Sequence, residues 1–93
     1  MALQWPDKDP NETLDYRLNW RARFPAGDSI VTSTWSDPTT STLVKDASTY
    51  TTYTTTLWLS AGAAGETETF TNTIVTAQGR TLEQSVSITL VEK

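Results

Sequence analysis

The sequence predicts an all-β protein, an antiparallel sandwich of six to seven short strands. The first observation is the alternation over 82–90, where the even positions are apolar except for Gln84 and the odd positions are polar. A second alternation of the same period runs over 13–24. The third observation is that turn-forming residues separate these runs, and that no stretch has the apolar spacing of an amphipathic helix.

Residues 1–12 are expected to form an extended N-terminal arm, and 13–93 a single sandwich domain. The arm contains Pro6 and Pro10 among aspartates and an asparagine, all of which interrupt regular structure. The long strand predicted over 13–24 has one buried face. The residues of that face are Leu14, Tyr16, Leu18, Trp20, Ala22 and Phe24, with Trp20 in the core.

The middle of the chain contains three further predicted strands, over 29–35, 42–45 and 53–60. The register of the first is ambiguous because Ile30 and Val31 are adjacent apolar residues. Leu43 is the predicted core residue of the second strand. The stretch 48–56 contains consecutive threonines and can be part loop.

The C-terminal residues form a predicted hairpin of two strands, 66–77 and 80–91. A glycine-containing turn, Ala77-Gln78-Gly79-Arg80, joins them. Strands of this length and spacing favour two antiparallel sheets packed face to face, as in immunoglobulin or fibronectin type III domains. A small closed barrel is the alternative.

Composition excludes several classes of function. The chain has neither cysteine nor histidine, so a thiolate zinc site and a serine–histidine or cysteine–histidine nucleophile cannot form. A net charge of −4 argues against a nucleic-acid partner, although Arg17, Arg21 and Arg23 are predicted to share one strand face and can meet an acidic protein. No apolar run approaches the roughly 20 residues that span a bilayer, and the N-terminus lacks signal-peptide character.

The carboxylates are interpreted as solvated surface charges, so we expect no enzyme, no catalytic residue and no cofactor. They are Asp15, Asp28, Asp37, Asp46, Glu66, Glu68, Glu83 and Glu92. Asp7, Asp9 and Asn11 have the spacing of a calcium loop. The loop contains Pro10, and Glu12 stands where the motif needs glycine, so no metal site is expected either.

The aromatic residues leave a binding function open. Trp58 is out of phase with Leu57 and Leu59, so either the tryptophan or the two leucines face outward. Trp35 is undecided between the core and the surface. A flat platform of Trp35, Trp58 and Tyr53 would suit stacking on sugars, and a carbohydrate-binding module is therefore the alternative function.

Protein–protein contact is the favoured function of the surface. The threonine-rich segment 48–56 has little charge, and an uncharged sheet edge is free to dock against another protein or another copy of the chain. The predicted partner-contact residues are Trp5, Trp58, Tyr50, Tyr53, Arg17, Arg21 and Arg23.

Three segments together carry a family resemblance. The first is Trp5-Pro6-Asp7-Lys8-Asp9-Pro10-Asn11-Glu12, followed by Leu14-Asp15-Tyr16 and Trp20. The second is Ile30-Val31-Thr32-Ser33-Thr34-Trp35 with Pro38. The third runs from Leu57-Trp58-Leu59-Ser60 through Gly62, Gly65-Glu66 and Thr71-Asn72 to Gly79-Arg80-Thr81. As a set they resemble small immunoglobulin-like structural proteins of tailed bacteriophages and prophages.

The resemblance implies a non-enzymatic part of a phage virion, made in the cytoplasm of the bacterial host. Its partners would be other virion proteins of the capsid, neck or tail. Decoration and stabilisation of the capsid is the first hypothesis, and a position in the neck or tail is the second. The resemblance also leaves open a homo-oligomer.

Overall fold

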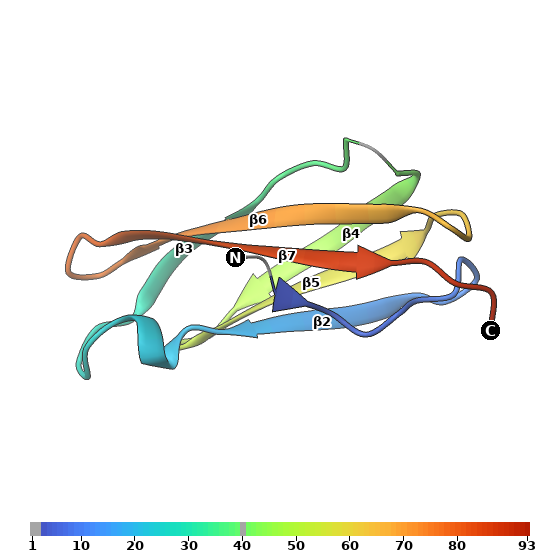
Figure 1. The fold of residues 1–93 in the computed structure, drawn as a ribbon. Coiled ribbons are helices and arrows are strands. Elements are labelled where there is room, and N and C mark those ends of the chain that lie inside the picture. The colour runs from blue at the N-terminus through green and yellow to red at the C-terminus, as the bar shows by residue number, and fades with distance from the viewer. Residues whose placement is uncertain (1–2, 40) are drawn as a thin grey trace.

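The computed structural model describes residues 3–39 and 41–93, which form two β-sheets packed face to face (Figure 1). The strands in chain order are β1 (Leu3–Gln4), β2 (Leu14–Asn19), β3 (Ile30–Trp35), β4 (Leu43–Tyr50), β5 (Thr54–Ala61), β6 (Thr67–Thr76) and β7 (Thr81–Thr89). One sheet has the order β1-β7-β6-β3 and the other β2-β5-β4. The predicted all-β sandwich is confirmed. Within the described residues the two sheets stay separate, so they do not form the alternative closed barrel.

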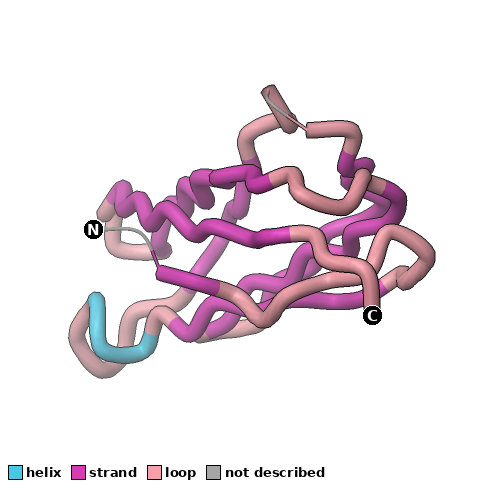
Figure 2. The backbone as a smooth tube through the Cα atoms, turned by 45° about the vertical axis from the view of Figure 1, so that its right-hand side comes forward, coloured by secondary structure: helices cyan, strands magenta, loops and turns pink. Residues whose placement is uncertain are grey.

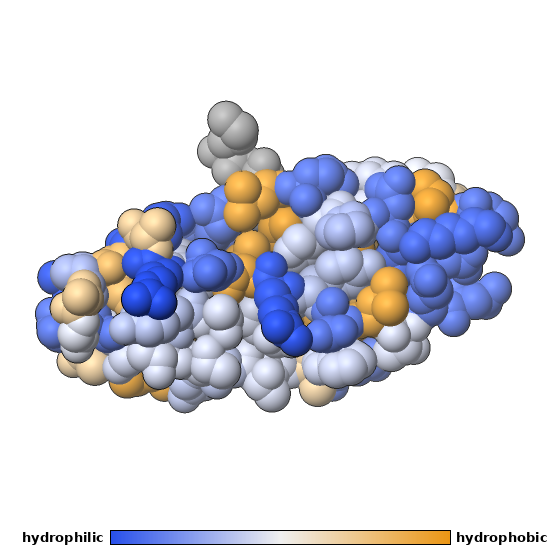
Figure 3. Space-filling view, turned by 90° about the horizontal axis from the view of Figure 1, so that it is seen from below, coloured by the Kyte–Doolittle hydropathy of each residue, from blue (hydrophilic) through white to orange (hydrophobic). Residues whose placement is uncertain are grey.

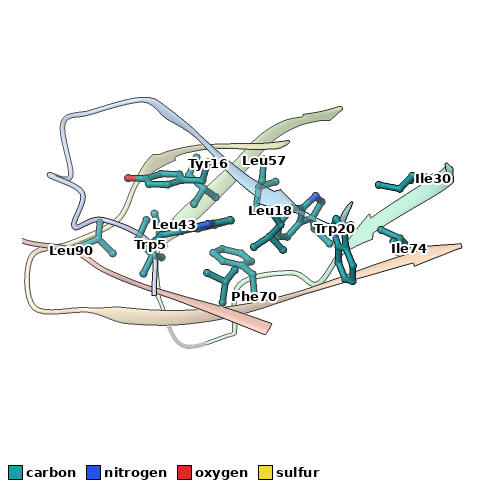
Figure 4. Close-up of a cluster of buried hydrophobic side chains, with 14 of the residues drawn as sticks. Trp5, Tyr16, Leu18, Trp20, Ile30, Leu43, Leu57, Phe70, Ile74 and Leu90 are labelled. Atoms are coloured by element: carbon teal, nitrogen blue, oxygen red, sulfur yellow. The ribbon is translucent and has the colours of Figure 1, made fainter. Parts of the chain in front are cut away.

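The C-terminal hairpin has the predicted alternation of faces. Phe70 lies opposite Val86, and both side chains are fully buried. Phe70 belongs to the core between the two sheets (Figure 4). On the outer face, hydroxyls bond across the same two strands, with 3.0 Å between Thr69 Oγ1 and Ser87 Oγ. Alternation with a period of two therefore separates a buried apolar row from a wet hydroxyl row.

A buried polar cluster ties the two sheets together. The Trp20 Nε1–H donates to Thr55 Oγ1 of β5 at 3.1 Å and to Asn72 Oδ1 of β6 at 3.2 Å. The Asn72 amide in turn donates to Ser33 Oγ and to the Thr34 carbonyl, both at 3.0 Å. Because these buried groups bond to one another, the cluster can hold the sheets in one register without an unpaired polar atom among them.

The strand predicted over 13–24 is too long. β2 ends at Asn19, whose side-chain oxygen accepts a hydrogen bond from the Arg21 N–H at 2.9 Å and turns the chain. Residues Arg21–Arg23 then form a 3-10 turn, the cyan segment of Figure 2. Trp20 and Phe24 are buried as predicted, but Ala22 is exposed, because a period of two does not continue through a helical turn.

The strand predicted over 42–45 is too short, since β4 continues to Tyr50. The hairpin turn between β4 and β5 is correspondingly tight, and the Thr51 N–H donates to the Thr54 carbonyl at 2.8 Å. A β-bulge at Asp46 shifts the register between Lys45 and Ala47. The consecutive threonines obscured the strand because they give no apolar alternation.

A second bulge resolves the ambiguous pair in β3. The register with β6 shifts between Ile30 and Thr32, so that Ile30 points into the core while Val31 is 43% exposed. At the N-terminus, β1 pairs with β7 in the parallel direction, which departs from the otherwise antiparallel pairing of the described strands. No helix of the described residues is long and apolar enough to cross a membrane.

Candidate functional site

Two carboxylates predicted to be solvated are buried. Asp28 is 1% exposed and Glu68 is 2% exposed. Asp28 accepts hydrogen bonds from the Ser29 and Gln78 N–H groups at 2.9 and 3.0 Å and from Arg80 Nη1 at 2.7 Å. Burial alone raises the pKa of Asp28, but hydrogen bonds, the one from Thr76 first, outweigh it and lower the pKa to about 2.

These two carboxylates hold loops in place. Glu68 accepts from the Thr39 N–H at 2.9 Å and from the Ser41 hydroxyl at 3.2 Å, so it fastens the β3–β4 connection to β6. Asp28 fastens the β2–β3 connection to the β6–β7 turn. The two side chains lie at different connections, so they do not form the paired carboxylates of a hydrolytic site.

The aspartates of the N-terminal segment are engaged within the fold. Asp9 accepts from the Asn11 N–H at 2.8 Å and from the Lys93 N–H at 2.9 Å, and these bonds lower its pKa. Glu12 accepts from the Asp9 N–H at 2.9 Å, which lowers its pKa as well. The described residues contain no group of three or more acidic, histidine or cysteine side chains that could hold a metal ion.

Sequence reasoning did not identify Lys8 as a core residue, although its side chain is fully buried. Its Nζ donates to the carbonyls of Ala61 at 2.9 Å and Asp9 at 3.0 Å, and burial lowers its pKa. Its backbone joins the end of β7, where the Lys8 N–H donates to the Thr89 carbonyl at 3.0 Å. A lysine between two aspartates has no sequence signal that distinguishes it from a surface lysine.

The three predicted contact arginines do not form one stripe. Arg17 lies on β2 and pairs with Asp15 at 3.7 Å. Arg21 lies on the 3-10 turn, with its guanidinium 5.1 Å from the centre of the Tyr53 ring. Arg23 reaches toward β7 and donates to Gln84 Oε1 at 2.9 Å. The prediction of a shared strand face fails because the strand ends before the second arginine.

The aromatic platform proposed for sugar binding is not present. Trp35 is buried, and Tyr53 is half-buried against Phe24, with 5.9 Å between the ring centres. Trp5, a predicted contact residue, also lies inside, where it stacks on Tyr16 at 4.9 Å. Three coplanar exposed rings, which stacking on sugars would need, are therefore not available.

Trp58 is the predicted contact residue whose ring lies on an open sheet face. Leu57 and Leu59 point into the core, and Trp58 points outward with 39% of its surface exposed. Across the strands it lies opposite Ala47 of β4 and Asp15 of β2. We define the Trp58 patch as Trp58, Ala47 and the exposed Val44, which lies opposite Ser60 on the same face.

The centre of the Trp58 patch is a residue type that is enriched at protein contacts. Tryptophan and arginine are enriched at the centres of protein interfaces, and the Asp15–Arg17 pair stands beside this tryptophan. The face that is seen when Figure 1 is viewed from below is mainly hydrophilic, with small separate hydrophobic spots (Figure 3). A small apolar centre with a polar rim therefore fits this protein better than a broad apolar surface.

Tyr50 lies at the end of β4, the edge strand of the same sheet. It is 45% exposed, and its hydroxyl donates to the Val31 carbonyl of β3 at 2.7 Å. Between β3 and β4 an open groove of about 320 Å³ is lined by residues such as Ser33, Trp35 and Ser48. The Trp58 side chain and this groove lie on different faces of their sheet, since Trp58 and Ser48 point to opposite sides, while Ala47 of β4 borders both surfaces.

One comparison with known proteins identifies the family. A family model described as "Podophage GP4 fiber-tail adaptor protein gp77" matches residues 8–89. The chain belongs to this family. No curated protein matches it. The protein is thus a structural component of a phage virion, and the predicted resemblance to virion structural proteins is confirmed at that level.

The matched range covers both candidate surfaces. It begins at the buried Lys8 and includes β2 to β7, hence the Trp58 patch and the groove, while β1 and Trp5 lie before it. The family consists of virion proteins, which agrees with the predicted localisation in the virion. Its description names the fiber and the tail, and it gives no support to decoration of the capsid.

Proposed function

We propose that the protein is a non-enzymatic adaptor that joins a fiber to the phage tail through protein–protein contacts. The observation that carries the proposal is the family match over 8–89. The family description favours the tail over the capsid position that the sequence suggested first. Buried carboxylates that serve as loop anchors, rather than as an acid pair in a cleft, are in keeping with a non-enzymatic role.

The topology supports an immunoglobulin-like scaffold for this role. An immunoglobulin-type sandwich places its second, fifth and fourth strands in one sheet and its third, sixth and seventh in the other. The orders β2-β5-β4 and β3-β6-β7 have that arrangement, with β1 added beside β7. Such a sandwich presents two outer faces and two open sides, so it can bind two partners at once.

We assign one of the two contacts to the Trp58 patch. A half-exposed tryptophan next to a small residue, Ala47, offers a flat apolar centre, and Arg17 supplies a polar rim. A homo-oligomer formed through the same patch is an alternative arrangement. Light scattering of the purified protein separates the two, because a monomer at working concentration leaves the patch free for a different virion protein.

The test uses phage that lack this gene and carry either the wild-type gene or the Trp58→Ser variant in trans. Without the protein, electron microscopy should show filled capsids and tails without fibers. The Trp58→Ser variant should restore few fibers, and the control Thr81→Ser, on the outer face of the other sheet, should restore them all. Particles that keep their fibers but lose capsid stability would instead establish the capsid role.

A further inference from the structure

The groove between β3 and β4 is bordered by two unpaired strand edges. Each of these strands is the last of its sheet, and the two face each other on one side of the sandwich. Two side chains of β4 cross the groove to β3 carbonyls. Tyr50 Oη donates to Val31 O at 2.7 Å, and Lys45 Nζ donates to Trp35 O at 2.9 Å. These two bonds bridge the two edges on either side of Ser33.

The main chain of Ser33 faces the space between these two bonds. In a strand, successive carbonyls alternate between the two neighbouring edges. The Ser36 N–H donates to the Thr71 carbonyl of β6, whereas the Trp35 carbonyl accepts a bond from β4. The Ser33 carbonyl, two residues before that of Trp35, therefore also points toward β4 and away from β6. The middle of the β3 edge is therefore available to a main-chain partner, as in the addition of a peptide strand to a sheet.

One residue that lines this groove also carries an unpaired buried donor. Trp35 is 6% exposed, and its Nε1–H has no hydrogen-bond partner within the described residues. Leaving a buried N–H unpaired is unfavourable, so such a group in a lined groove indicates a missing acceptor. A carbonyl oxygen of a bound peptide is an acceptor of the right kind.

The opposite wall adds a charge. The β4 bulge pushes Asp46 out of the ladder, and its exposed carboxylate makes no hydrogen bond or ion pair in the part of the chain that the structure describes. Lys45 beside it is already paired, since its Nζ lies 2.7 Å from Asp37 Oδ1. Asp46 also attracts the ammonium of the buried Lys8, but its exposed carboxylate leaves a negative charge on the wall, which favours a cationic side chain.

We propose that this groove seats a short extended segment of the adaptor's partner protein, with a main-chain carbonyl at Trp35 and a lysine or arginine at Asp46. The proposal rests on the adaptor function and names the chemistry of one partner. A second copy of this chain is disfavoured as the occupant, because pairing β4 with β4 would bring two bulges and two Asp46 carboxylates together on a protein of net charge −4. At about 320 Å³ the groove is at the lower end of ligand-site volumes, which fits a few residues only.

The experiment measures binding of overlapping 12-residue peptides from the fiber and tail proteins of the same phage to the purified full chain. At least one peptide that contains Lys or Arg should bind, and it should shift the Trp35 indole signal in an NMR spectrum. Ser48→Tyr fills the groove from an exposed position, and Asp46→Lys reverses its charge. Both should weaken binding at least tenfold, whereas the exposed Thr81→Tyr, outside the groove, should not.

The outcomes separate the groove from the adaptor function. Urea unfolding of each variant confirms that it folds. No peptide bound to the wild-type protein, or binding that Ser48→Tyr leaves unchanged, overturns the groove proposal. If phage without the gene lose their fibers while Ser48→Tyr phage keep them, the adaptor function stands and the groove proposal fails. If phage without the gene keep their fibers, the adaptor function itself fails.

Discussion

At the residue scale, the buried polar side chains divide into those with partners and those without. Asp28 and Glu68 are surrounded by donors, and each stabilises a connection between strands. Tyr16 Oη and Trp35 Nε1 are the buried side-chain atoms of the described residues that have no hydrogen-bond partner. Both of these rings contact Trp5, with ring centres 4.9 and 5.6 Å from it. Trp5 therefore packs against both of the rings that carry these unpaired atoms.

Asp28 predicts how the stability of the fold changes as the pH falls. Its pKa is lowered from 3.8 to about 2, so folding favours the ionised form. The resulting stability is fully present above about pH 4 and is lost as the pH falls toward 2. The urea midpoint should therefore drop over this range. Asp28→Asn should lower the midpoint at pH 7 and flatten its acid dependence, and an unchanged acid slope in this variant would contradict the assignment.

Tyr16 predicts how the stability of the fold depends on pH in alkaline solution. Burial raises its pKa from 10.0 to about 12, so stability is full below pH 10 and is lost as the pH rises through 12. Tyr16→Phe should leave stability at pH 7 equal or higher, since it removes an unpaired buried hydroxyl whose burial costs about 1–3 kcal/mol. The Tyr16→Phe variant should also lose less stability than the wild-type protein as the pH rises from about 10 to about 12. Tyr50→Phe is the control and should destabilise by about 0.5–1.5 kcal/mol, because its hydroxyl is bonded to Val31.

At the element scale, the fold could be predicted wherever alternation continues through a whole strand. The β6–β7 hairpin has the predicted faces, because Phe70 and Val86 are flanked by polar residues on both sides. The prediction failed at Ala22, where a side-chain bond from Asn19 turned the chain, and over 48–50, where threonines can form either strand or loop. Tertiary contacts decide both cases, and they are not encoded in local periodicity.

The candidate site was predictable only in part. The alternation of the strand placed Trp58 on one face and Leu57 and Leu59 on the other. It could not decide which of these two faces points outward. The sandwich decides this by burying two leucines against the other sheet rather than one tryptophan. The groove was not predictable, since it depends on a bulge at Asp46 and on two edges that meet only in the folded chain.

Two neighbours on β5 give a test of this choice of face. Leu57→Ala should destabilise the protein by about 2–5 kcal/mol, because it leaves a cavity at a side chain that is 1% exposed. Trp58→Ala should cost about 1 kcal/mol or less, the scale of cross-strand contacts on a sheet surface. Urea unfolding measures both. Equal losses would mean that Trp58 serves the core rather than a partner.

The turn after β5 offers a second matched pair. Gly62 and Gly65 have positive φ angles of 95° and 91°, so alanine at either position costs about 1–2 kcal/mol of backbone strain. At Gly62 the new Cβ would also overlap Leu90 Cδ2, which is buried, and overpacking adds about 1–3 kcal/mol. At Gly65 nothing lies within 4 Å. Gly62→Ala should therefore lower the urea midpoint further than Gly65→Ala, and the reverse order would contradict the packing.

At the scale of the whole molecule, side chains protect the open sides of the sandwich. On one side the Trp5 Nε1–H donates to the Arg17 carbonyl of β2 at 3.1 Å. On the other side Tyr50 and Lys45 of β4 bond to carbonyls of β3. Bonds of this kind reduce the number of free edge groups that can pair with unrelated chains. The part of the β3 edge that stays open, at Ser33, is short, so it can select one peptide segment over unrelated strands.

The same topology predicts slow folding. Among the strand pairs of the described residues, only β4–β5 and β6–β7 are local hairpins. Leu3 pairs with Val86, Leu14 with Leu59 and Ile30 with Thr76. Sandwiches dominated by such distant pairings fold in roughly milliseconds to seconds. Stopped-flow tryptophan fluorescence should show one exponential phase in that range, with folding and unfolding arms that reproduce the equilibrium stability. Folding faster than a millisecond would mean that the distant pairs do not limit the rate, and that the hairpins alone carry the transition state.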